Sequence, residues 1–256
     1  MRQLLHYVLF LLKSTNRHGV HSPFVFELVT KCLNTKSNEQ TQSILKQYRK
    51  NLYSNPKEIE VTDFGAGSKI FKTNRRTIRN IAKTAGISLK RSLLLNRLVN
   101  HLNAETGLEL GTSVGLASAA MAVNNSMKLV TVEGCQQTAL TAVENLTMLK
   151  NTSVEVINID FDTYLEKLDK DLVFDMVFVD GNHKKIPTLR YFEKLLGHLH
   201  NNSVVIFDDI YWSKEMTEAW KAIKAHEKVT VSIDLFFWGM VFFRNEQQKQ
   251  HFTIRV

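Results

Sequence analysis

The sequence predicts an α/β protein built around a mainly parallel sheet. Three observations lead to this fold class. Short apolar runs alternate with helical stretches from about residue 107 onward, a glycine loop follows the first of these runs, and the chain closes with two strands separated by a few residues. Hydrophobic residues make up 44% of the 256 positions and charged residues 23%, which excludes a disordered or fibrous chain.

The alternating region contains seven expected strands. The first five should be parallel because helical stretches separate them, and the last two should form a closing antiparallel pair. The expected strands cover residues 108–110, 129–132, 154–157, 173–179, 204–207, 229–233 and 236–243. The helical stretches cover residues 115–123, 136–150, 161–168 and 186–200.

The first hundred residues are expected to form a separate, mainly helical lobe, with the sheet domain over 101–256. Apolar residues from Leu4 to Leu12 recur at spacings of three and four, which predicts an amphipathic helix that packs on the core or on a partner subunit. Residues 34–60 are polar and are expected to be a connection. A second helix is predicted from Ser88, as its N-cap, to His101.

The net charge of +8 is unevenly distributed. Residues 1–100 carry 18 Lys and Arg against 5 Asp and Glu, a net +13, whereas residues 101–256 carry 15 against 20, a net −5. A basic lobe attracts anions, so an anionic small molecule or RNA is an expected partner, and self-association through the N-terminal helices is a third possibility. The densest basic segment comprises Lys69, Lys72, Arg75, Arg76, Arg79 and Lys83.

Cysteine use and hydropathy indicate the compartment. Cys32 and Cys135 are about a hundred positions apart, too few and too distant for a disulfide framework. No apolar run approaches the roughly 20 residues that a membrane helix needs. We therefore expect a cytoplasmic protein.

Two glycine loops compete for the role of a nucleotide-binding loop. Such a loop needs a strand before it, a helix after it and an acidic residue about 20 positions later at a second strand tip. The loop Asp63–Ser68 lacks the helix and the acid. The loop Glu109–Gly115 has both, because a helix of small residues follows it and Glu133 ends the next strand. A carboxylate at that position can accept hydrogen bonds from two ribose hydroxyls.

The segment Glu109-Leu-Gly111-Thr-Ser113-Val-Gly115 together with Glu133 resembles the cofactor signature of class I S-adenosylmethionine-dependent methyltransferases. The resemblance covers residues 101–256 and implies a Rossmann-like sheet of seven strands with a reversed last strand. It also implies that the loop lies along the methionine and ribose moieties and that Glu133 binds the ribose. Asp160 would lie by the adenine, although its neighbourhood also suits a helix N-cap.

A second group of residues carries chemistry. Asp180 ends the fourth strand and Asp208 and Asp209 end the fifth, so three carboxylates should meet at one edge of the sheet. Their repulsion would be relieved by a hard divalent cation such as Mg²⁺, Mn²⁺ or Ca²⁺. The cation could lower the pKa of a substrate hydroxyl, and His183 could take the proton.

This arrangement resembles the metal-dependent O-methyltransferases, both the catechol and caffeoyl-coenzyme A type and the Asp-Gly-x-His type. By that similarity Asp180, Asp208 and Asp209 are metal ligands, Asp180 also lies at the cofactor, and His183 is the general base. Two departures weaken the metal assignment. Lys184-Lys185 replaces a frequent aromatic-acidic pair, and Asn201-Asn202 replaces the usual Gly-Gly before the fifth strand.

Three hypotheses follow. The first is a metal-assisted O-methyltransferase acting on a hydroxylated small molecule. The second is an RNA or tRNA methyltransferase that uses the basic lobe, and the third is a binding protein that keeps the fold without catalysis. Four aromatic residues are candidates for a substrate wall, although such residues more often belong to a core: Tyr211, Trp212, Phe236 and Trp238.

Overall fold

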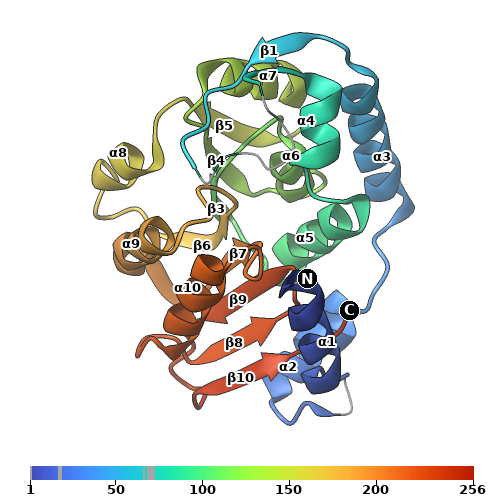
Figure 1. The fold of residues 1–256 in the computed structure, drawn as a ribbon. Coiled ribbons are helices and arrows are strands. Elements are labelled where there is room, and N and C mark those ends of the chain that lie inside the picture. Colours follow the sequence, from blue (N-terminus) through green and yellow to red (C-terminus); the bar gives the residue numbers. More distant parts are fainter. Residues whose placement is uncertain (1, 17–18, 66, 68–72) are drawn as a thin grey trace. The chain divides into compact units, whose positions relative to one another are not determined.

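The computed structural model describes residues 2–16, 19–65, 67 and 73–256, and Figure 1 shows its elements. The chain divides into two compact units. The central unit comprises Thr35–Tyr164, and the terminal unit comprises the residues up to Asn34 together with Leu165–Val256. The expected functional lobe of residues 1–100 stays a prediction.

The central unit contains a parallel sheet of the order β3-β4-β5. Its strands are β3 (Thr106–Leu110), β4 (Lys128–Val132) and β5 (Ser153–Ile157). The connections are helical, so each strand follows its neighbour by a crossover, as parallel pairing requires. The helices are α3 (Glu39–Ser54), α4 (Ile78–Thr84), α5 (Leu89–His101), α6 (Leu116–Ala122), α7 (Gln136–Leu146) and α8 (Phe161–Glu166), the last of which runs past the end of the unit.

The prediction of a connection over residues 34–60 is wrong, because α3 occupies most of it. Asn38 caps this helix by accepting the N–H of Thr41 at 2.7 Å, and Leu45, Tyr48 and Leu52 are buried. These three apolar positions lie on one face but are sparse among polar residues, which hid the helical period. Beyond α3, a short antiparallel pair of β1 (Glu58–Glu60) and β2 (Arg75–Thr77) was also unexpected.

The terminal unit contains strands in the order β10-β8-β9-β7-β6. β6 and β7 are parallel, β9 runs antiparallel to both β7 and β8, and β10 is parallel to β8. The strands are β6 (Phe174–Val179), β7 (Leu199–Asp208), β8 (Val231–Asp234), β9 (Trp238–Phe242) and β10 (Gln250–Thr253). The helical segments are α1 (Arg2–Lys13), α2 (Pro23–Leu28), the π-helical turn η2 (Val29–Leu33), α9 (Lys185–Leu195), the 3₁₀ turn η3 (Leu196–His198) and α10 (Lys214–Ala225).

The predicted α/β class, with mostly parallel strands and a closing antiparallel pair, is confirmed. The seven expected strands are present, and β10 is an addition to the count. His251 of β10 lies 2.7 Å from the Ser232 hydroxyl of β8, and Ile254 forms a parallel bridge to Thr15. The polar sequence of β10 gave no apolar signal for a strand, because this edge segment has no buried face to fill.

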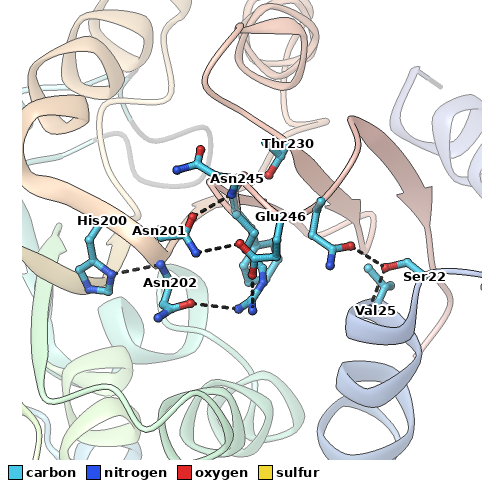
Figure 2. A network of polar contacts seen from close by, with 11 residues as sticks. Ser22, Val25, His200, Asn201, Asn202, Thr230, Asn245 and Glu246 are labelled. Atoms are coloured by element: carbon cyan, nitrogen blue, oxygen red, sulfur yellow. Dashed lines mark hydrogen bonds and ion pairs between the residues drawn. The ribbon is translucent and has the colours of Figure 1, made fainter.

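The two asparagines that precede the expected fifth strand lie within β7 and have a structural role that Figure 2 shows. Asn201 accepts the N–H of Asn245 at 2.8 Å and donates to Glu246 at 2.9 Å. Asn202 accepts a hydrogen bond from Arg244 at 3.2 Å. The departure from Gly-Gly at this point therefore ties the start of β7 to the segment between β9 and β10.

Helix α1 confirms the predicted N-terminal helix but exposes most of its apolar side. Phe10 is its buried residue, and it packs with Tyr7 against Phe236. Leu4 and Leu12 are 66% and 78% exposed. None of the helices in the described ranges combines the length and the apolarity that crossing a membrane needs.

Candidate active site

The glycine loop of the central unit joins β3 to α6. Gly111 and Gly115 have φ values of +112° and +85°, which glycine adopts without strain. At Gly115 a Cβ atom would also lie 2.7 Å from the Tyr48 hydroxyl. Ser113 between them adopts φ +50°, a conformation held by the loop around it. Every side chain of α6 is buried, as expected for a helix of small residues that packs closely.

Glu133 lies directly after β4 and fastens this loop. Its Oε2 accepts the N–H of Ser113 at 2.9 Å, and its Oε1 accepts the N–H of Cys135 at 2.9 Å. Burial raises the pKa of the carboxyl, and the two N–H donors partly oppose that rise. Each carboxylate oxygen has a second lone pair, so the group can still accept two hydroxyl donors. Ribose binding by Glu133 stays a prediction.

Glu109 is fully buried in β3 beneath the loop. The hydroxyl of Thr131 donates to its Oε2 at 2.5 Å and the hydroxyl of Ser118 donates to the same oxygen. Oε1 is buried and has no hydrogen-bond partner among the residues that the structure describes. Burial raises the pKa of Glu109 to about 7. Thr131 further contacts Thr112 at 2.6 Å. Glu109 therefore supports the loop from the core, and its predicted contact with the cofactor stays a prediction.

Asp160 is the N-cap of α8. Its carboxylate accepts the side-chain hydroxyl of Thr163 at 2.6 Å and the backbone N–H of Thr163 at 2.9 Å, and these bonds lower its pKa. This is the capping role that the sequence also allowed, and contact with an adenine stays a prediction. Asn158 was missed. Its amide donates to the carbonyls of Glu133 and Gly134 at 2.7 and 3.1 Å, and a polar residue at the end of β5 was the available signal.

The terminal unit holds the predicted general base. Asp180 follows β6, and its Oδ1 lies 3.6 Å from Nε2 of His183. Both side chains are largely buried, at 16% and 22% exposure. Asn182 and His183 have φ values of +65° and +47°, two consecutive non-glycine residues in the left-handed region. Asn182 donates to the Tyr191 hydroxyl of α9 at 2.9 Å, which helps to hold this turn.

Asp208 is the last residue of β7, and Asp209 follows it. Asp208 pairs in register with Trp238 and is 6% exposed. Asp209 has φ +53° and donates its N–H to the Phe237 carbonyl at 3.0 Å. Within the ranges that the structure describes, no three His, Cys, Asp or Glu side chains come together to hold a metal ion. The carboxylates suit a hard cation chemically, and their role as metal ligands stays a prediction.

The four candidate wall aromatics separate into two groups. Trp238 is fully buried and packs against Phe178, so it belongs to the core. Tyr211 donates to Asp234 and stacks on His6 and Phe236 at centroid distances of 5.0 and 5.4 Å. Tyr211, Phe236 and Trp212 are partly exposed. Tyr211 and Phe236 pack against side chains of α1. The sequence pattern did not indicate this contact.

The basic segment of the central unit is only partly described. Lys69 and Lys72 lie outside the described residues. Arg75 lies 3.7 Å from Glu58 across the β1–β2 pair, and Lys83 lies over the Tyr53 ring at 5.7 Å. Cys32 and Cys135 are both buried free thiols.

Part of the chain matches a known protein family. Residues 104–210 match a protein family described as a methyltransferase domain. An O-methyltransferase of Bacillus cereus, solved with S-adenosylhomocysteine, is similar with 20% identity and a TM-score of 0.56, over 86% of this chain and 97% of that one. Comparison with curated protein sequences gives no match.

Two further structures are similar. A methyltransferase of Podospora anserina, bound to S-adenosylhomocysteine, has 12% identity and a TM-score of 0.60, over 88% of this chain and 97% of that one. An O-methyltransferase of Streptomyces achromogenes involved in tomaymycin synthesis, in complex with S-adenosylmethionine, has 19% identity and a TM-score of 0.57, over 83% and 93%. At these identities the likeness shows the fold.

Proposed function

Since residues 104–210 match a family described as a methyltransferase domain, we propose that the protein is an S-adenosylmethionine-dependent enzyme that methylates a hydroxyl oxygen of a small-molecule acceptor, with His183 as general base. The names of the similar structures, two of which are O-methyltransferases, support oxygen as the acceptor atom. The single observation that carries the chemistry is the largely buried pair of Asp180 and His183 at the end of β6.

The central unit provides the residues for the methyl donor. Gly111, Ser113 and Gly115 allow close approach of a ligand to the loop backbone, and Glu133 accepts hydrogen bonds from ribose hydroxyls. S-adenosylmethionine, when bound, supplies a methyl group activated by a positively charged sulfur. Glu109 holds the loop by accepting the hydroxyls of Ser118 and Thr131, so the loop keeps its form before a ligand arrives.

The terminal unit provides the residues for the acceptor. Nδ1 of His183 takes the proton from the acceptor hydroxyl, which makes the oxygen nucleophilic. Asp180, 3.6 Å from Nε2, stabilises the imidazolium that results. The turn that carries Asn182 and His183 in left-handed conformations orients the ring, and the contact of Asn182 with Tyr191 supports that turn.

The test compares two histidine variants. His183→Ala should lower kcat by about 100- to 10,000-fold with catechols or similar phenols as acceptors, the usual contribution of a general base. His200→Ala is the matched control, because His200 also pairs with an aspartate, Asp175, at 2.8 Å in the same unit. Both variants should keep the wild-type affinity for S-adenosylhomocysteine. Equal kcat values for His183→Ala and wild type would exclude His183 as the base.

Metal assistance by Asp180, Asp208 and Asp209 stays a prediction, and no step above depends on a cation. Activity that is lost with a chelator and restored by Mg²⁺ would support it. Activity that is unchanged after exhaustive chelation would remove Mg²⁺, Mn²⁺ and Ca²⁺ from the account. RNA as acceptor and a homodimer through the N-terminal helices also stay predictions, and no contact described above favours a second function.

A further inference from the structure

A segment that the sequence pattern set aside lies against the predicted ribose site. The sequence pattern predicts no binding role for Glu60. The structure shows that its N–H donates to the Gln137 side chain of α7 at 2.7 Å. The N–H of Thr62 lies 3.3 Å from the Cys135 sulfur, and that thiol in turn donates to the Glu60 carbonyl at 3.6 Å. These contacts fix residues 60–62 beside the start of α7, two residues beyond Glu133.

Phe64 follows this anchored stretch and lies over Gly134. A Cβ atom added at Gly134 would meet the Phe64 ring at 2.9 Å and 3.1 Å. Gly134 does not adopt a positive φ, so the backbone conformation does not require a glycine here. The missing side chain instead leaves room for the Phe64 ring. The ring therefore occupies the place that a side chain directly after Glu133 would fill.

Phe64 is 60% exposed although its side chain is large and apolar. Burying a phenylalanine stabilises a protein by roughly 1.5–3 kcal/mol, and most of that gain is forgone here. Asp63 accepts the N–H of Gly65 at 2.9 Å, which stabilises the turn that presents the ring. An exposed aromatic side chain thus lies against Gly134, the residue that follows the carboxylate that we assign to the ribose.

We propose that Phe64 binds the adenosine part of S-adenosylmethionine by stacking on the base. This inference rests on the proposed function, because it needs Glu133 to bind the ribose. A purine offers a π-face to an aromatic ring, and an apolar surface that water would otherwise cover is removed from water on binding. Phe64 therefore belongs to the binding site even though it precedes the glycine loop by more than 40 residues in the sequence.

The first test is the affinity for S-adenosylhomocysteine by isothermal titration calorimetry. Phe64→Ala should weaken binding by about 5- to 100-fold, the range for loss of one aromatic–base stack. Phe64→Trp should keep an affinity close to that of wild type, because the wider ring retains the stacking face. Leu140→Ala is the control, since Leu140 of α7 is a similarly exposed apolar residue of the same unit, at 56%. Circular dichroism should show all variants folded.

A double-mutant cycle tests the contact between Phe64 and Gly134. Gly134→Ala places a methyl group against the ring and should weaken binding in the wild-type background. In the Phe64→Ala background the same change has no ring to displace and should have little effect. Additive effects of the two substitutions would contradict the proposed placement of the ring.

A fragment of the ligand identifies which part Phe64 contacts. 5′-Methylthioadenosine has the adenosine but no amino acid, so Phe64→Ala should weaken its binding by the same factor. Unchanged binding of this fragment by Phe64→Ala would overturn the assignment to adenosine, as would unchanged binding of S-adenosylhomocysteine. If wild type binds neither ligand, the proposed function fails first, and the two failures are thereby distinguishable.

Discussion

The two units handle their acidic residues differently. In the central unit Glu133 accepts two backbone N–H groups and Glu109 accepts two hydroxyls, so these carboxylates are tied to the glycine loop and to the core. In the terminal unit Asp180 lies 3.6 Å from His183 in a strained turn, beyond ordinary hydrogen-bond length. Under the proposed function, the carboxylates of the binding site are fixed by the fold, whereas proton transfer depends on two loop residues.

The largest expected effect comes from replacing Glu133. Glu133→Ala should weaken S-adenosylhomocysteine binding by about 100-fold or more, because hydrogen bonds to a charged group contribute roughly 1.5–3 kcal/mol each and two are lost. Calorimetric titration measures the change. Glu144→Ala is the control, since Glu144 is an exposed carboxylate of the same unit paired with Lys57 at its surface. Equal affinity of Glu133→Ala and wild type would refute the ribose assignment.

The next effect concerns the pH dependence of stability. Burial raises the pKa of Glu109 to about 7, whereas the unfolded carboxyl ionises near its ordinary value of 4.5. The stability that neutral Glu109 contributes is fully present below about pH 4.5 and is lost as pH rises towards 7. The unfolding free energy should therefore fall by about 3 kcal/mol between pH 4.5 and 8 on account of this residue, at 1.36 kcal/mol per pKa unit.

Glu109→Gln should remove most of that fall, because the amide keeps an oxygen for Ser118 and Thr131 but does not ionise. Urea unfolding at several pH values measures it. Glu155→Gln on β5 is the exposed control and should follow wild type. A Glu109→Gln protein that loses stability with pH as steeply as wild type does would show that another group is responsible.

The smallest effect concerns α1 of the terminal unit. Leu4 and Leu12 are 66% and 78% exposed, so replacing both by Glu should change the unfolding free energy by less than about 1 kcal/mol. If the predicted homodimer forms through these helices, light scattering will give a dimer mass for wild type and a monomer mass for the double variant. A wild-type monomer at high concentration would remove that prediction.

The sheet and the glycine loop were predictable because their signals are local. Strands β3 to β9 coincide with apolar runs, and Gly111, Gly115 and Glu133 have the spacing that a nucleotide loop needs. Helix α3 was not predicted because only three of its 16 residues, Leu45, Tyr48 and Leu52, are both apolar and buried.

The remaining features depend on contacts between distant residues. Nothing near Phe64 in the sequence indicates Gly134, seventy positions later, and nothing near His6 indicates Tyr211. The three carboxylates at the strand ends were expected to meet because parallel strands end together. Such a rule places backbones but not side chains, and Asp209 turns with φ +53° directly after β7.

The most direct test of the division of labour is to titrate S-adenosylhomocysteine into wild type, Glu133→Ala and His183→Ala side by side. We expect tight binding by wild type and His183→Ala and a loss of about 100-fold or more in Glu133→Ala. Methyl transfer should be absent or greatly reduced in both variants. Retained affinity in Glu133→Ala, or an equal loss of affinity in His183→Ala, would contradict the assignment of binding to one unit and proton transfer to the other.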